Sequence, residues 1–312
     1  MNAKQLFRSQ WTIGCCLLAL AFAMCGGLPS SAYAQDEGEL PEPVDVQLET
    51  SDGVALSAVF YPGTNEKETV PVILVHAWQE KRQTMIAMAA HLQAQFGYAV
   101  MVPDLRGHGD SMKTVGGDEL DRDRWRGPQL TAVLEDIEAC KKYLINENNQ
   151  GNLNIDMLSI VADRESTILA TTWTLRDWSY APLGSIKQGQ DVKALVMLNP
   201  MRNFKGLNGN DAYQNDLYTG RTGAAFPVLI ASTRDKSRDA KNISERMMRG
   251  RKSLDAPDKA LETVRYQVES SRRVIKSRKN GDRMLSMDIG KFIEKQVYQR
   301  RHDFRWAERG SK

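Results

Sequence analysis

The sequence predicts one domain of the α/β class, in which a mostly parallel β-sheet lies between layers of helices. Five short runs of apolar residues have the nearly continuous hydrophobicity of strands buried on both faces. Stretches with the spacing of amphipathic helices lie between most of these runs, and this alternation favours right-handed crossovers in a parallel sheet. Two segments of alternating polarity precede the runs and predict an antiparallel hairpin at the start of the domain.

The individual elements follow from these local patterns. The hairpin strands are expected at residues 44–50 and 54–61, with a turn at residues 51–53. The buried strands are expected at residues 71–75, 99–102, 157–161, 194–198 and 228–231. Helices are expected at residues 84–96, 130–145, 167–176 and 289–301, because apolar residues recur there every three or four positions. A short insertion is expected at residues 199–225.

The first 34 residues are typical of a secretory signal peptide. Lys4 and Arg8 give a positive start, residues 13–24 are apolar, and residues 32–34 form a small-residue cleavage motif that ends at Ala34. The apolar run is shorter than the roughly 20 residues that a spanning helix needs. We therefore expect cleavage after Ala34, export to the periplasm or the extracellular space, and no membrane span in the mature chain.

Cleavage would leave 278 of the 312 residues, enough for one domain with a large core. Of the four cysteines only Cys140 would remain, so no internal disulfide could form. The net charge of +3 falls to +1 without Lys4 and Arg8, which gives no reason to expect nucleic acid as a partner. Residues 35–43 are acidic and contain proline, and we interpret them as a disordered lead-in to a domain at residues 44–312.

Residues 97–111 carry the most specific motif in the chain. Asp104, residues 106–109 (Arg-Gly-His-Gly) and Ser111 resemble the loop after the fourth strand of α/β-hydrolases, where these residues build a turn. Residues 76–78 (His-Ala-Trp) resemble the His-Gly-x segment that follows the third strand of that family. The resemblance covers essentially the whole mature chain and implies a single α/β-hydrolase domain of esterase or acyl-hydrolase ancestry.

The two histidines of these motifs are expected to be structural. Glycines on both sides of His108 suit a tight backbone turn after a buried strand. We expect His76 to anchor its own loop through hydrogen bonds. A catalytic pair formed by His108 and Asp104 is the alternative.

The resemblance also implies where a nucleophile would lie. Gly-x-Ser-x-Gly follows the fifth strand of the family, and residues 162–166 (Ala-Asp-Arg-Glu-Ser) stand there in this chain. Arg164 therefore occupies the nucleophile position, and a permanently protonated guanidinium cannot attack a carbonyl. The backbone N–H groups of Trp78 and Glu165 are the expected oxyanion donors. Two shifts of the alignment would make Ser166 or Asp163 the nucleophile, although bulky residues would then flank either one.

The other two members of a catalytic triad are also assigned by resemblance. Asp235, after the strand at residues 228–231, matches the position of the triad acid. Residues 280–285 (Asn-Gly-Asp-Arg-Met-Leu) resemble a His-Gly-x-x-Met-Leu stretch of secreted bacterial members, with Asn280 in place of the histidine base. An amide cannot relay a proton. A base relocated from elsewhere in the chain, where His91 and His302 also occur, is the alternative.

These assignments favour an exported pseudo-hydrolase. In this hypothesis Arg164 pairs with Asp235 and either closes the former crevice or binds an anionic small molecule. One rival is a working hydrolase with a differently aligned or relocated triad. Another is a module that binds acidic polymers through the basic residues 246–283, which we otherwise interpret as solvated helix faces. The sequence contains no motif for a metal or another cofactor, and it names no substrate.

Overall fold

The protein is described by a computed structural model, which covers residues 39–184, 187–220, 226–233, 237–251, 261–266 and 285–310. The strands are β1 (Val44–Glu49), β2 (Ala55–Tyr61), β3 (Pro71–Val75), β4 (Ala99–Pro103), β5 (Leu158–Asp163), β6 (Val192–Leu198), β7 (Asn203–Phe204), β8 (Leu207–Asn208), β9 (Val228–Thr233) and β10 (Leu261–Tyr266). The helices are α1 (Ile86–Phe96), α2 (Pro128–Thr131), α3 (Leu134–Asn149), α4 (Ser166–Ser179), α5 (Asn210–Tyr213), α6 (Asp216–Thr219), α7 (Ser237–Arg251) and α8 (Leu285–Gln296).

Eight of the strands form one sheet in the order β1-β2-β4-β3-β5-β6-β9-β10. β1 pairs antiparallel with β2, and β2 pairs antiparallel with β4. The remaining neighbours, from β4 to β10, pair in parallel. This arrangement confirms the predicted fold class, with an N-terminal antiparallel hairpin ahead of a mostly parallel sheet.

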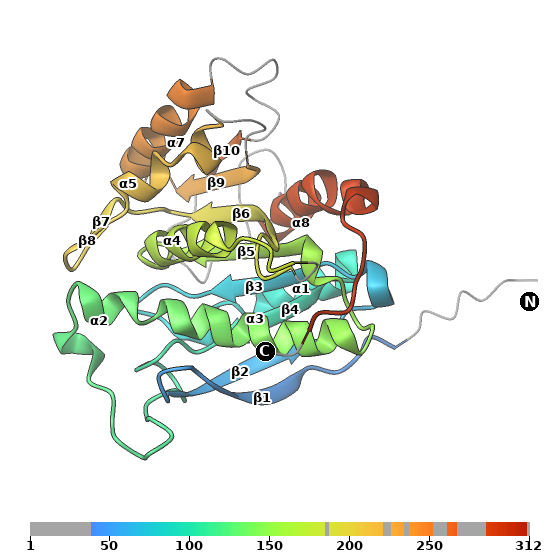
Figure 1. The fold of residues 1–312 in the computed structure, drawn as a ribbon. Coiled ribbons are helices and arrows are strands. Elements are labelled where there is room, and N and C mark those ends of the chain that lie inside the picture. The colour runs from blue at the N-terminus through green and yellow to red at the C-terminus, as the bar shows by residue number, and fades with distance from the viewer. Residues whose placement is uncertain are drawn as a thin grey trace, which may run out of the picture. The chain divides into compact units, whose positions relative to one another are not determined.

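Helices cover both faces of the sheet (Figure 1). On one face, α3, α4 and α7 share an apolar cluster with strand residues such as Ile73 and Ile160. On the other face, α1 and α8 share a second cluster with residues such as Val72 and Val161. Residues next to each other in a strand thus enter opposite clusters, which explains why the central strands are apolar at every position. No helix among the described residues has both the length and the apolar character that crossing a bilayer requires.

Several boundaries differ from the sequence prediction. β5 continues through Asp163 because Ala162 and Asp163 still pair with Met197 and Leu198 of β6. The helix predicted at residues 130–145 is divided into α2 and α3. The edge strand β10 was not predicted, since its alternating residues lie within the basic stretch that we interpreted as helical.

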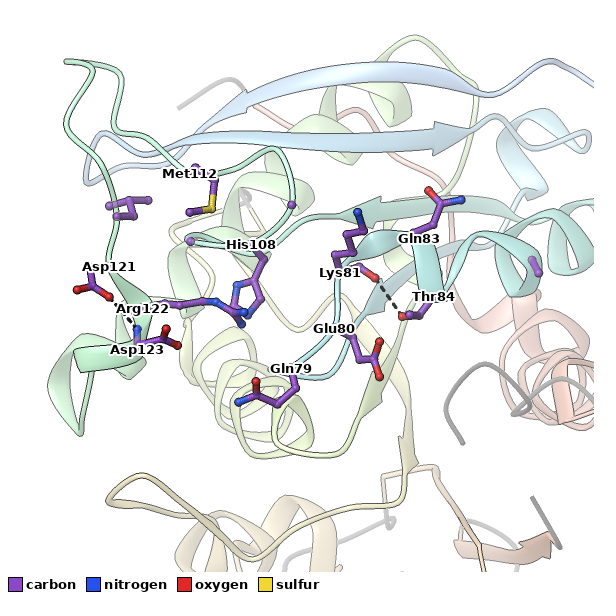
Figure 2. Close-up of a pocket in the computed structure, with 14 residues that line it drawn as sticks. Gln79, Glu80, Lys81, Gln83, Thr84, His108, Met112, Asp121, Arg122 and Asp123 are labelled. Carbon is purple, nitrogen blue, oxygen red and sulfur yellow. Dashed lines mark hydrogen bonds between the residues drawn. The ribbon is translucent and has the colours of Figure 1, made fainter. Parts of the chain in front are cut away.

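The loops at the carboxyl ends of β3 and β4 surround a pocket of about 740 Å³ (Figure 2). One wall comes from the segment between β3 and α1, which contains the 3-10 turn η2 (Arg82–Thr84). The other wall comes from the long segment between β4 and α2, which contains the 3-10 turn η3 (Arg122–Arg124). The carboxyl edge of an α/β sheet is where proteins of this class bind ligands.

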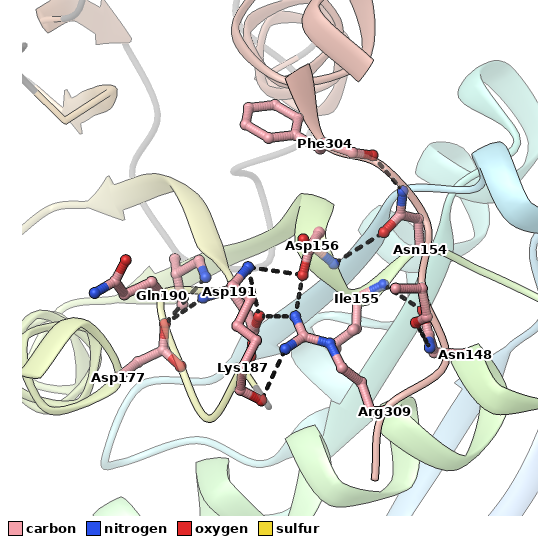
Figure 3. Close-up of polar contacts among 12 residues, drawn as sticks. Asn148, Asn154, Ile155, Asp156, Asp177, Lys187, Gln190, Asp191, Phe304 and Arg309 are labelled. Atoms are coloured by element: carbon pink, nitrogen blue, oxygen red, sulfur yellow. Dashed lines mark hydrogen bonds and ion pairs between the residues drawn. The ribbon is translucent and has the colours of Figure 1, made fainter. Parts of the chain in front are cut away.

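At the opposite edge, the C-terminal segment is fixed by a buried network of charges (Figure 3). Arg309 is buried and forms ion pairs with Asp156 and Asp191, which precede β5 and β6. Lys187 Nζ lies 2.7 Å from Asp156 Oδ1 and 3.1 Å from Asp191 Oδ1. Lys141 Nζ, on α3, lies 2.8 Å from Asp191 Oδ2. The network therefore joins the end of the chain to two central strands and one helix.

Replacement of Arg309 tests this connection. Arg309→Ala leaves the Asp191 carboxylate buried with less positive charge around it, and we expect the free energy of unfolding to fall by about 3 kcal/mol. Arg305→Ala removes an exposed charge from the same segment, and a loss below about 0.5 kcal/mol is expected. The measurement is urea denaturation followed by circular dichroism. Equal stabilities of the two variants would contradict a structural role for Arg309.

Candidate functional site

The turn between β5 and α4 has the backbone of a strained strand-to-helix connection. Arg164 lies in it with a φ of 47°, a left-handed conformation that is uncommon for a residue with a long side chain. Its N–H donates to the carbonyl of Leu198 over 2.8 Å, which ties the turn to the end of β6. A sharp, strained turn at this place presents the nucleophile in α/β-hydrolases. Here it presents a guanidinium.

Two carboxylates neighbour the Arg164 guanidinium. Arg164 Nη2 lies 3.0 Å from Glu80 Oε1, in the segment that follows β3. Arg164 Nε lies 3.9 Å from Oδ2 of the adjacent Asp163. Both the Arg164 and the Glu80 side chains are 25% exposed, so the pair is partly shielded from solvent and its charges attract each other more strongly than a surface pair would. The positive charge at the turn is therefore largely neutralised by the protein itself.

The pairing of Arg164 with Asp235 lies outside the described residues, as do both Asp235 and Asn280. Sequence reasoning did not identify Glu80, which is the partner of Arg164 that the structure describes. The available signal was an acidic residue two positions after Trp78, in the loop expected to face the nucleophile turn.

The backbone N–H of Trp78 donates to Glu165 Oε2 over 3.2 Å. Trp78 was one of the two expected oxyanion donors, and Glu165 was the other. In this structure the Glu165 carboxylate accepts the hydrogen bond of the Trp78 N–H. A negatively charged oxygen therefore already occupies the position in front of the Trp78 amide.

The Trp78 side chain is completely buried beneath the loops of this edge. Its ring packs at centroid distances of 4.8 Å from His108, 6.1 Å from Trp125 and 5.6 Å from Phe204 of the β7-β8 hairpin. These aromatic contacts fix the loop after β3. One of them comes from the insertion after β6, through Phe204. The Trp78 amide is consequently held in one orientation.

His76 is a neutral loop anchor, as the sequence analysis expected. Its Nε2 accepts a hydrogen bond from the Leu105 N–H over 3.0 Å, which places the ring proton on Nδ1, and Nδ1 donates to the Ala77 carbonyl over 2.8 Å. Burial, together with the nearby His108, lowers the pKa of His76 to about 3. Both ring nitrogens are thus engaged with the backbone, and neither can accept a proton from a nucleophile.

His108 and Asp104 have separate partners. The His108 ring nitrogens face the carbonyls of Arg106 at 2.9 Å and Trp78 at 2.6 Å. Burial, followed by the charge of Arg122, lowers the pKa of His108. Asp104 instead forms an ion pair with Arg82 over 2.6 Å. These contacts favour the structural interpretation of the loop over a catalytic His108–Asp104 pair.

The two alternative nucleophiles lie at the same turn. Ser166 is buried at the start of α4, and its hydroxyl donates to the His76 carbonyl over 2.6 Å. Its proton is therefore directed to a carbonyl oxygen and not to a base. Asp163 is also buried, and its Oδ1 has no hydrogen-bond partner among the described residues. Burial raises the pKa of Asp163 to about 7, an effect that the adjacent Arg164 charge partly offsets.

Within the described part of the chain, no histidine ring nitrogen forms a hydrogen bond with a serine hydroxyl. The same residues contain no group of three or more His, Cys, Asp or Glu side chains that could hold a metal ion. The arrangement at the carboxyl edge is therefore one of ion pairs and loop anchors.

Comparison with known proteins identifies the architecture. No family model and no curated protein matches the sequence. An esterase of Pyrococcus furiosus, Pf2001, is similar in structure with a TM-score of 0.56 and 14% identity, over 82% of this chain and 92% of that chain. EstE1, a thermostable carboxylesterase cloned from a metagenomic library, has a TM-score of 0.51 and 17% identity, over 73% of this chain and 79% of that one.

A third similar structure, an esterase of Pyrobaculum calidifontis, has a TM-score of 0.50 and 14% identity, over 74% of this chain and 77% of that chain. Likeness at such identities establishes an architecture and leaves the reaction open, because one fold supports many functions. The sheet order, the N-terminal hairpin and these neighbours together show that the chain has the α/β-hydrolase fold.

Proposed function

We propose that this chain is an exported pseudo-hydrolase of esterase ancestry, in which the former catalytic crevice is closed by the protein's own charges. The observation that carries the proposal is Arg164, which lies in a left-handed strand-to-helix turn and is paired with Glu80 over 3.0 Å. The backbone conformation supports the alignment that gives Arg164 the nucleophile position. A guanidinium at that position cannot form an acyl-enzyme.

The contact between Glu165 and Trp78 supports the same proposal. An oxyanion hole stabilises a developing negative charge with backbone N–H groups that are unoccupied in the free enzyme. The Glu165 carboxylate already accepts the hydrogen bond of Trp78, so an incoming oxyanion would meet a like charge. A restored nucleophile would therefore act beside a partly blocked oxyanion hole.

The charges around Arg164 favour closure over ligand binding at this residue. The Arg164 guanidinium is paired with Glu80 and lies 3.9 Å from Asp163, so the turn carries little excess positive charge for an anion. Asn280 at the base position and Asp235 at the acid position enter the proposal by alignment, and export enters through residues 1–34. The working hydrolase is the weaker alternative, because the Ser166 hydroxyl donates to a carbonyl.

Covalent labelling tests the absence of an activated serine. The purified mature chain is expected to remain unlabelled by a fluorophosphonate probe and to show no turnover of p-nitrophenyl acetate. Labelling of the wild-type chain that disappears in Ser166→Ala would contradict the proposal and establish the alternative alignment.

Restoration of the missing groups tests the ancestry. In the double variant Arg164→Ser with Asn280→His, we expect labelling by the probe and slow ester turnover. Adding Glu165→Ala should raise that turnover by a further ~10²-fold, because it frees the Trp78 amide for the oxyanion. The matched control is Arg164→Ala with Asn280→His and Glu165→Ala, which removes the same ion pair without supplying a hydroxyl. If the folded triple variant were no more active than this control, the assignment of Arg164 to the nucleophile position would be wrong.

The protonation of Asp163 distinguishes a buried structural acid from an aspartate nucleophile. The pKa of Asp163 in the folded chain, about 7, lies above the ordinary value of 3.8. Between these pH values the carboxyl is ionised in the unfolded chain and protonated in the folded chain. The folded state therefore loses stability as the pH rises through that window. Asp163→Asn should therefore stabilise the protein by roughly 1 to 3 kcal/mol at pH 8 and by almost nothing at pH 4.

The measurement is denaturant unfolding of wild type and variant across this pH range. The exposed Asp118→Asn serves as the control and should show no such dependence. A destabilisation by Asp163→Asn that is the same at every pH would mean that the carboxylate is ionised and held by its neighbours, as a nucleophile requires.

A further inference from the structure

The pocket between the two loops lies beside the Arg164 turn and has features of its own. It opens at the carboxyl ends of β3 and β4, whereas Arg164 follows β5, and its volume of about 740 Å³ is within the range of small-molecule sites. Figure 2 shows Lys81 on one wall, and Arg122 beside His108 on the other. The polar lining includes Gln79, Gln83, Thr84, Asp121 and Asp123.

Arg122 contributes a positive charge to this wall of the pocket. Its Nη1 donates to the Trp78 carbonyl, and no carboxylate among the described residues pairs with its guanidinium. Arg82 and Arg176, by contrast, each pair with a carboxylate, Asp104 and Glu135 respectively. A guanidinium has five donors in a planar fork, so Arg122 has several N–H groups left for a planar oxyanion such as a carboxylate.

The balance of charge in the pocket indicates a ligand with one negative charge. Glu80 is paired with Arg164, and Asp121 is paired with Arg124 over 3.0 Å. Lys81, Arg122 and Asp123 also line the pocket, and none of the three has an ion-pair partner among the residues that the structure describes. These three groups leave one net positive charge. A phosphate monoester, which carries up to two negative charges, would exceed this single positive charge.

The uncharged lining indicates hydroxyl groups on the same ligand. Gln79 and Gln83 carry amides that both donate and accept hydrogen bonds. The Thr84 hydroxyl donates to the Lys81 carbonyl over 3.0 Å and keeps its oxygen as an acceptor. Asp123 lies on the same 3-10 turn as Arg122 and adds a carboxylate that can accept from a hydroxyl close to the bound anion.

We propose that this pocket binds a small hydroxylated monocarboxylate, of the class of sugar acids and hydroxy acids, with the carboxylate on Arg122 and Lys81 and the hydroxyl groups on Asp123 and the amides. The site is separate from the Arg164 turn and does not depend on the absence of hydrolysis. Binding is coupled to the core of the edge, because the Arg122 guanidinium carbon lies 6.0 Å from the Trp78 ring and the same side chain holds the Trp78 carbonyl.

Calorimetric titration of the mature chain at low salt tests the proposal. D-glucuronate is the probe, and D-glucose is the uncharged control. Glucuronate should bind at least about tenfold more tightly than glucose or inorganic phosphate, and it should change the tryptophan fluorescence. Arg122→Gln should weaken glucuronate binding by about tenfold or more, and Arg122→Lys should weaken it nearly as much because the ammonium lacks the fork.

Two further variants keep the test decisive if Arg122→Gln folds poorly. Lys81→Gln, an exposed substitution on the opposite wall, should weaken binding several-fold, whereas the exposed Lys113→Gln, which lies outside the pocket lining, should leave it unchanged. Equal binding of glucuronate and glucose, equal effects of the Lys81 and Lys113 substitutions, or no heat with glucuronate would overturn the proposal. Propionate, a monocarboxylate without a hydroxyl group, is the remaining arm: if it bound through Arg122 and glucuronate did not, the assignment of a hydroxylated ligand would be wrong.

Discussion

The ion pair between Arg164 and Glu80 is the interaction on which the state of the carboxyl edge depends. It connects the turn after β5 to the loop after β3, the two segments that hold the nucleophile and an oxyanion donor in hydrolases of this fold. A left-handed turn stores backbone strain, and strain of this kind persists only where the surroundings compensate for it. The Glu80 contact and the hydrogen bond to the Leu198 carbonyl supply such compensation. The turn is thus held in a strained conformation by contacts from two neighbouring segments.

Trp78 connects this ion pair to the rest of the edge. Its amide donates to Glu165 at the turn, and its carbonyl accepts from His108 and Arg122 on the pocket side. Its ring is enclosed by aromatic residues from the insertion after β6 and from the segment after η3. The Trp78 backbone therefore links the turn after β5 on one side to the pocket on the other. Because the Trp78 unit is buried and hydrogen-bonded on both sides, a shift of a partner on one side would displace the partners on the other side.

The fold was predictable from the sequence because its determinants are local. An apolar run such as Pro71–Val75 identifies a central strand wherever it occurs, and the Gly-His-Gly motif identifies the loop that follows β4. The partners of Arg164 and Arg309 were not predictable, because Glu80 and Asp156 approach them only through the tertiary structure. Long-range ion pairs leave no periodic signal in a single sequence. The strand β10 was missed for a different reason: its alternation is short and lies among basic residues that are common on exposed helices.

The two halves of the carboxyl edge have different electrostatic properties, and the difference follows from their partners. At the turn after β5, the Arg164 guanidinium is paired with Glu80 and lies near Asp163, so little of its positive charge remains for an added anion. At the pocket beside β4, the Arg122 guanidinium is held by a carbonyl, which fixes its position without cancelling its charge. A cation that is neutralised by a carboxylate loses its affinity for anions. A cation that is held in place by a neutral carbonyl keeps that affinity. The loop after β3 takes part in both halves, because Glu80 pairs with Arg164 on one side and the Trp78 carbonyl holds Arg122 on the other.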